Sequence, residues 1–177
     1  VYMGADGPMP NEGTAIDSPG ARFIVEEAMR EDPRPLYICM LGAITDLACA
    51  YLLEPRIAQK LTAIWIGGGE WPSGGPEFNC GGDIDGANVI LSSAMPLWQV
   101  PRDVYKQMAV SLAELQLRIS PYGKIGEYLF RQMVEFNDAM GENGRDWPHG
   151  ESWGLGDQAT VTLLLEEAQS KNYEWRI

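Results

Sequence analysis

The chain has 177 residues, of which 45% are apolar and 21% charged, and its formal net charge is −12. This length suits one domain with a buried core, and the ordinary apolar content excludes collagen-like, coiled-coil and low-complexity chains. The acidic balance, with no basic run, argues against nucleic acid or an anionic membrane surface as partners. The longest apolar stretches fall well short of the roughly 20 residues that cross a bilayer, so we expect a soluble protein.

The cysteines bear on the redox state of the protein, and the first residues bear on where its domain begins. Cys39, Cys49 and Cys80 form no C-x-x-C pair, and an odd number does not indicate a disulfide framework. They are expected to be reduced thiols, and we favour a cytoplasmic location. The opening Val1-Tyr2-Met3-Gly4-Ala5 is unlike a charged signal sequence. We interpret it as the end of a buried strand entering a loop, so residues 1–177 are expected to form a single, incomplete domain.

Helical patterns then alternate with short apolar runs that end at glycine or proline. Strands are predicted over residues 36–41, 61–66 and 97–100, and helices over 19–31, 45–54, 84–93, 102–118, 121–140 and 157–168. Ser18 is the expected N-cap of the first helix, with Pro19 at its first position. The stretch 141–156 is predicted as a surface loop and 173–177 as an edge strand. Strands separated by helices need crossover connections, so we predict an α/β fold with a mostly parallel sheet and helices on both faces. Ligands of such sheets bind at the carboxyl ends of the strands.

Polar residues gather after the second predicted strand. Gly67-Gly68-Gly69 would let a backbone approach a ligand closely, although it lacks the spacing of a phosphate loop. The segment Pro76-Glu77-Phe78-Asn79 follows, and with Asp83 and Asp85 it places an amide and three carboxylates within nine residues. These groups can receive sugar hydroxyls, because a carboxylate accepts hydrogen bonds and an amide both donates and accepts. The alternative for this loop is a solvated acidic surface. Asp83 is assigned to capping the next helix.

The order of these motifs resembles that of the inosine–uridine nucleoside hydrolase family. The matching segments are Leu41-Gly42-Ala43-Ile44-Thr45-Asp46, Ile64-Trp65-Ile66-Gly67-Gly68, Glu77-Phe78-Asn79, Asp83-Ile84-Asp85-Gly86-Ala87, Leu97-Trp98-Gln99-Val100-Pro101 and Gly156-Asp157-Gln158-Ala159. In the family, a G-P-L-T-N turn, an M-G-G strand end, an E-F-N motif and a D-P-E-A-A helix start come in this order. The resemblance runs over most of the chain and is densest from Leu36 to Pro101.

This resemblance implies Ca²⁺-dependent cleavage of the N-glycosidic bond of ribonucleosides. In the family, the ion holds the ribose hydroxyls and a water, and an aspartate takes the water's proton as it attacks the anomeric carbon. By position, Asp157 and the backbone carbonyl of Leu41 resemble calcium ligands. Glu77 and Asn79 match residues that grip the ribose hydroxyls, and Phe78 would line the sugar pocket.

Loop tryptophans are further candidates for substrate contact. Trp71, Trp147 and Trp153 lie in predicted loops where an indole could stack on a nucleobase or a sugar, or could pack against its own loop. We favour Trp153 for a substrate contact, because it is the nearest of them to Asp157.

The chain also departs from the family pattern. The family's aspartate cluster, D-x-D-x-x-x-D-D, supplies the base and most calcium carboxylates, and it does not occur in these 177 residues. We therefore expect the base in an N-terminal segment before Val1, and activity from the intact protein rather than from this stretch alone. Gly156 stands where the family commonly has a histidine. His149, the only histidine, is either a substitute acid or an exposed loop residue.

Three interpretations follow from the sequence. In the first, the intact protein is a Ca²⁺-dependent N-ribohydrolase acting on ribonucleosides or a related glycoside. In the second, the protein is a non-catalytic relative that binds a sugar or nucleoside without cleaving it. In the third, it is a structural subunit that pairs with another chain. The expected partners are a small nucleoside or sugar and either further copies of the chain or the missing N-terminal segment.

Overall fold

The computed structural model describes residues 1–142 and 150–169. The chain divides into two compact units, Val1–Val104 with Thr160–Ile177, and Tyr105–Ala159. The expectation of a single domain over the whole chain stays a prediction. Within the described ranges, no helix is both long and apolar enough to span a membrane. The predictions made for Trp147, His149 and the strand 173–177 lie outside the described residues.

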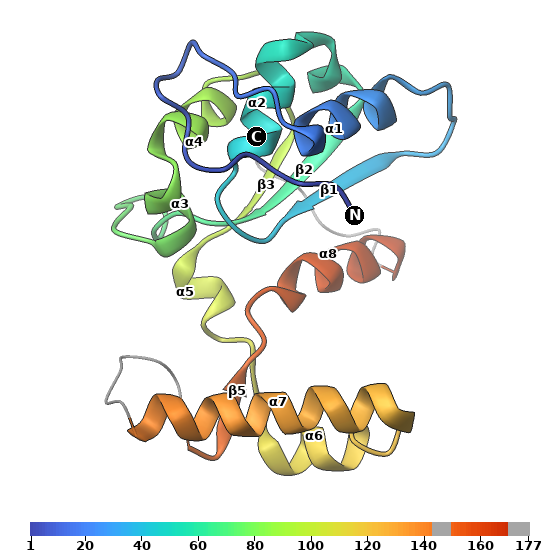
Figure 1. The fold of residues 1–177 in the computed structure, drawn as a ribbon, viewed down its shortest axis with the longest axis vertical. Coiled ribbons are helices and arrows are strands. Elements are labelled where there is room, and N and C mark those ends of the chain that lie inside the picture. The colour runs from blue at the N-terminus through green and yellow to red at the C-terminus, as the bar shows by residue number, and fades with distance from the viewer. Residues whose placement is uncertain (143–149, 170–177) are drawn as a thin grey trace. The chain divides into compact units, whose positions relative to one another are not determined.

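The first unit is built around a parallel sheet (Figure 1). Its strands lie in the order β1-β2-β3, with β1 at Leu36–Met40, β2 at Leu61–Ile66 and β3 at Leu97–Val100. The two strand pairs are in parallel register, so all three carboxyl ends lie at the same edge of the sheet. β2, the central strand, is almost entirely buried, as expected for a strand covered on both faces. These strands and helices confirm the predicted α/β class and the parallel sheet; helices on both faces of the sheet stay a prediction.

Helices cover one face of this sheet and enclose the main core. The helical elements of this part of the chain are α1 (Pro19–Met29), α2 (Thr45–Leu53), η1 (Pro55–Gln59), α3 (Phe78–Gly82) and α4 (Ile84–Leu91). Figure 1 shows α1, α2 and α4 on the same side of the strands. Their buried side chains form one cluster with alternate residues of β2, including Ala63 and Trp65. α1 begins where the sequence predicts, because the Ser18 hydroxyl accepts a hydrogen bond from the Ala21 amide.

Residues 1–18, here called the N-terminal strap, form no helix or strand. The interpretation of residues 1–5 as the end of a buried strand is therefore wrong, because Val1, Tyr2 and Met3 are exposed and pair with no strand. Hydrogen bonds to helix starts fix the strap instead: the Ala5 amide donates to Asp46 over 3.0 Å, and the Met9 amide donates to Asp83 over 3.1 Å. The Met9 side chain is only 3% exposed. The strap is therefore part of the packed unit although its backbone is irregular.

The second unit corrects two predictions. The predicted helix 102–118 is wrong, because α5 ends at Tyr105 and a strand precedes α6; 152–154, within the predicted loop, is also a strand. Pairing between these two strands outweighs the local helical pattern, as non-local contacts often do. The elements are α5 (Arg102–Tyr105), β4 (Ala109–Ser111), α6 (Leu112–Arg118), α7 (Gly123–Glu142), β5 (Ser152–Gly154) and α8 (Gln158–Gln169), with β4 antiparallel to β5. α5 and α8 each include residues of both units.

Candidate functional site

The turn that follows β2 is held by a complete set of hydrogen bonds. Both backbone groups of Gly67 and of Gly68 are bonded, and so is the carbonyl of Ile66. The partners are the backbone of Val100 and Arg102 and the side chains of Glu77, Asn79 and Gln99. Gly68 has a φ of +84°, a conformation that glycine adopts without steric cost. The turn is thus fixed by residues from β3, α3 and α5.

The Glu77 carboxylate connects this turn to the start of α3. It accepts hydrogen bonds from the amides of Gly68 at 2.8 Å, Asn79 at 3.1 Å and Cys80 at 2.9 Å. The residue is 8% exposed, and a carboxylate offers about four acceptor positions. Backbone amides therefore occupy most of the acceptor positions of the Glu77 carboxylate. A grip of Glu77 on a substrate hydroxyl stays a prediction.

Asn79 lies beside the same turn and has a defined amide orientation. Its Nδ2 donates to the carbonyl of Ile66 over 2.8 Å. The opposite orientation would set the amide oxygen against a carbonyl oxygen, and two acceptors repel each other. Among the described residues, no hydrogen bond reaches Asn79 Oδ1. The amide oxygen of Asn79 can therefore accept a hydroxyl from a ligand.

Phe78 points away from the protein between these two inward-facing residues. Its side chain is 90% exposed, and that of Trp71, in the loop between β2 and α3, is 89% exposed. The Glu77-Phe78-Asn79 motif thus presents an aromatic ring to solvent while its polar groups contact the turn. Exposed rings of this kind can stack on sugars or bases. The pocket-lining role of Phe78 stays a prediction.

The turn that follows β1 lies at the same sheet edge. Leu41 is 48% exposed, and the carbonyl of the next residue, Gly42, accepts a 3.0 Å hydrogen bond from Nε1 of Trp65 in β2. Met40 lies opposite Trp65 in the strand register. The first unit therefore brings the Leu41 turn, the Gly67 turn and the Glu77-Phe78-Asn79 motif to one edge of the sheet, as the sequence predicts.

Asp83 caps α4, as the sequence predicts. Its carboxylate accepts hydrogen bonds from the amide of Gly86 at 2.8 Å, the hydroxyl of Thr45 at 2.6 Å and the amide of Met9. It is 2% exposed. Asp83 therefore joins α2, α4 and the N-terminal strap. The contact with Met9 could not be predicted from the sequence, because it crosses 74 positions.

Asp157 and Trp153 belong to the second unit. Trp153 lies in β5 opposite Val110, and its ring meets Phe136 of α7 edge-on at a centroid distance of 5.8 Å. It therefore packs against its own unit, and a substrate contact stays a prediction. Asp157 is an exposed residue, yet partial desolvation of its carboxyl raises its pKa above the ordinary value. Because each unit is described separately, a joint site of Asp157 with Leu41 also stays a prediction.

The donor set of the described residues does not by itself fit a calcium ion. Ca²⁺ takes about 6–8 oxygen ligands. Over residues 1–142 and 150–169, no group of three or more His, Cys, Asp or Glu side chains is arranged to hold a metal ion. Asp46, Glu77 and Asp83 lie near the sheet edge, but each accepts hydrogen bonds from backbone amides. One carboxylate and one carbonyl, those of Asp157 and Leu41, leave such a shell incomplete.

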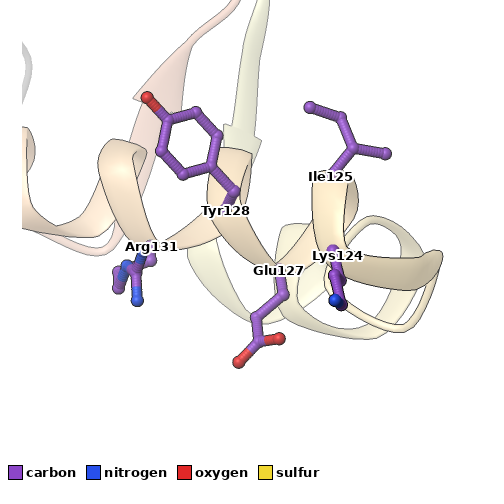
Figure 2. A pocket seen from close by; sticks show the side chains of 5 residues that line it. All are labelled: Lys124, Ile125, Glu127, Tyr128 and Arg131. Atoms are coloured by element: carbon purple, nitrogen blue, oxygen red, sulfur yellow. The ribbon is translucent and has the colours of Figure 1, made fainter.

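A separate hollow of about 540 Å³ lies on α7. Figure 2 shows Ile125 and Tyr128 on one side of the helix and Glu127 and Arg131 on the other, with Lys124 near its start. None of the predicted site residues lines this hollow. We therefore assign it no part in the candidate site.

Comparisons with known proteins agree with this arrangement. The model of the family described as inosine-uridine preferring nucleoside hydrolase matches residues 2–177. A pyrimidine-specific ribonucleoside hydrolase from Salmonella arizonae is 26% identical over 173 residues, which cover 92% of this chain and 53% of the relative. A probable uridine nucleosidase from Arabidopsis thaliana is 26% identical over 134 residues, covering 73% of this chain and 41% of the relative. The chain spans about half the length of the curated relatives it matches.

Solved structures show the same fold. A plant nucleoside hydrolase has a TM-score of 0.70 and 23% identity, and the match covers 88% of this chain and 49% of that chain. A purine-preferring ribonucleoside hydrolase from Gardnerella vaginalis has a TM-score of 0.71 and 21% identity, with the same coverage of 88% and 49%. From the extent of the family match and the order of its motifs at one sheet edge, we conclude that this chain belongs to the inosine-uridine preferring nucleoside hydrolase family.

Proposed function

We propose that the full-length protein hydrolyses the N-glycosidic bond of ribonucleosides or of a closely related glycoside. The observation that carries the proposal is the acceptor oxygen Asn79 Oδ1 at the sheet edge formed by the two strand-end turns, in a motif whose neighbouring Phe78 ring is exposed. An acceptor oxygen suits a sugar hydroxyl, and an aromatic face suits a sugar ring or a base. Family membership and the curated hydrolase relatives support the same chemistry.

In this proposal, the residues of this chain bind and orient the sugar. Asn79 accepts a hydrogen bond from a ribose hydroxyl, and its own amide group stays fixed by the Ile66 carbonyl. Phe78 covers the sugar and excludes water from that side. Glu77 keeps the two turns in place. The reaction itself replaces the bond between the anomeric carbon and the base nitrogen with a bond to a water oxygen, and it returns a proton to the leaving base.

The assay is release of free base from a panel of ribonucleosides by the full-length protein, followed by chromatography. Asn79→Ala is expected to raise KM by about tenfold, the effect of one lost hydrogen bond of roughly 1.4 kcal/mol. Asn88→Ala is the matched control, because Asn88 is an exposed amide on α4 bonded only to Glu12. No base release from any ribonucleoside would refute the proposal. If both variants had the same KM, Asn79 would not contact the substrate.

We also propose that the whole protein depends on Ca²⁺, with Asp157 and the Leu41 carbonyl among its ligands. The described residues supply too few oxygens for a complete shell, so the proposal requires further carboxylates from outside the described ranges. Treatment with a chelator is expected to abolish turnover, and Ca²⁺ to restore it. Asp157→Asn should weaken Ca²⁺ binding in calorimetry, whereas Asp138→Asn, an exposed carboxylate of the same unit, should not. Full activity in chelator would refute this part.

A second candidate function is binding of a nucleoside or sugar without cleavage. It is favoured by Gly156, where the family commonly has a histidine. A Cβ added at this position would lie 3.2 Å from the Tyr105 ring, so a larger side chain requires that ring to shift. This candidate predicts ribonucleoside binding in calorimetry with no base released over prolonged incubation. Measurable turnover by the full-length protein would exclude it.

A further inference from the structure

Trp65 connects the two turns at the carboxyl edge of the sheet. It lies in β2 one residue before the strand ends and is fully buried. Its indole Nε1 donates a hydrogen bond to the carbonyl of Gly42, in the turn after β1. Backbone hydrogen bonds join β1 and β2 only as far as the register pair Met40 and Trp65. The indole extends this connection beyond the end of β1.

The ring also determines which residue can occupy position 67. A Cβ added to Gly67 would lie 2.2 Å from Cε2 of Trp65, far closer than two carbon atoms approach. The indole therefore fills the space beside the Gly67 turn, and the glycine is needed to accommodate it. The Gly67 turn is in turn fixed by the hydrogen bonds from Glu77, Asn79 and Gln99.

We propose that Trp65 is a positioning residue, which transmits the fixed geometry of the Gly67 turn to the Leu41-Gly42 turn through its indole N–H. Trp65 itself touches no substrate, because it is fully buried. The inference rests on the proposed function, since these two turns form the edge at which the nucleoside is proposed to bind. The sequence pattern gives little indication of this role of Trp65, because a tryptophan in an apolar strand usually serves core packing alone.

The test replaces Trp65 with phenylalanine in the full-length protein, which keeps an aromatic ring and removes the N–H donor. Trp98→Phe is the matched control, because Trp98 lies in the neighbouring strand and contacts the ring of Tyr37. Two measurements are made: amide hydrogen exchange at Gly42 and Ala43, and the separate values of kcat and KM for ribonucleoside cleavage. If W65F does not fold, benzothienylalanine at position 65 preserves the shape of the indole without its N–H.

The expected result is faster amide exchange at the Leu41-Gly42 turn and a rise in KM of about tenfold, the size of effect that one lost hydrogen bond produces. A variant that was merely destabilised would lose kcat in proportion to its unfolded fraction and keep its KM. Wild-type values of KM and exchange in W65F would overturn the inference, and so would faster exchange with an unchanged KM. Absence of cleavage by the wild-type protein would instead refute the proposed function, and this inference with it.

Discussion

Removal of the Asp83 carboxylate should cost more stability than any other single substitution considered for this chain. Asp83→Ala removes the N-cap of α4, which is worth about 0.5–2 kcal/mol. It also leaves the Met9 amide and the Thr45 hydroxyl without their acceptor in the interior. Each such group costs about 1–3 kcal/mol. The sum of these contributions is a decrease of about 2.5–8 kcal/mol in the free energy of unfolding.

Such a loss is a large fraction of the roughly 5–15 kcal/mol that stabilises a typical domain, so milder variants are measured beside it. Asp83→Asn keeps one acceptor oxygen and places an amide group against the other donors, which should cost about 1–3 kcal/mol. Thr45→Val removes the 2.6 Å hydrogen bond alone and should cost about 1–2 kcal/mol.

The assay is urea unfolding followed by circular dichroism, with the slope of free energy against urea checked for each variant. Asp85→Asn is the control, because it changes a half-buried carboxylate of the same helix start and is expected to cost less than about 1 kcal/mol. A decrease below about 1 kcal/mol for Asp83→Ala would refute the reasoning, because it would mean that water or other groups satisfy the buried donors.

Three further outcomes are expected. Burial raises the pKa of the Cys49 and Cys80 thiols, but Cys49 alone of the three cysteines is fully buried. Iodoacetamide at about pH 8 should therefore label Cys49 more slowly than the half-buried Cys39 and Cys80, as mass spectrometry can follow; equal rates would contradict this. Gly68→Ala should destabilise the protein by at least about 1–2 kcal/mol, because of the positive φ and because the added Cβ would lie 2.3 Å from Gln99 Nε2, whereas Gly81→Ala should show neither penalty. Hydrogen bonds from Arg56 lower the pKa of Glu54 to about 2, so the stabilisation is present above the ordinary pKa of 4.5 and is lost as the pH falls toward 2. Arg56→Gln should return the Glu54 pKa toward 4.5 in a carboxyl NMR titration, and no change would contradict the ion pair.

Local patterns were sufficient to predict most of the first unit. Ser18 and Pro19 mark the start of α1, and the apolar run of β2 identifies a buried strand, because these signals act within a few residues. The helix predicted over 102–118 is wrong because Val110 pairs with Trp153, a partner far along the chain that no local pattern indicates. Non-local pairing is what sequence windows miss.

The candidate site was predicted only in part, because its position follows from local patterns whereas its hydrogen bonds do not. The sequence placed Glu77 and Asn79 after a strand end, where parallel sheets bind ligands, and the structure has them there. Their hydrogen bonds to the Gly67 turn depend on the path of the intervening loop, which the residue pattern does not specify. The Trp65 contact with Gly42 was missed, because an apolar strand gives no sign that one of its side chains also donates a hydrogen bond.

The N-terminal strap has a consequence for the order of folding. Two of its anchors join positions 41 and 74 residues apart, and their acceptors, Asp46 and Asp83, lie at the starts of α2 and α4. Both helices must be in place before the strap can dock, because closing such long loops early costs entropy that no contact yet offsets. Substitutions in the strap should therefore accelerate unfolding and leave the folding rate nearly unchanged. We therefore expect the first residues of this chain to be among the last to reach their native positions.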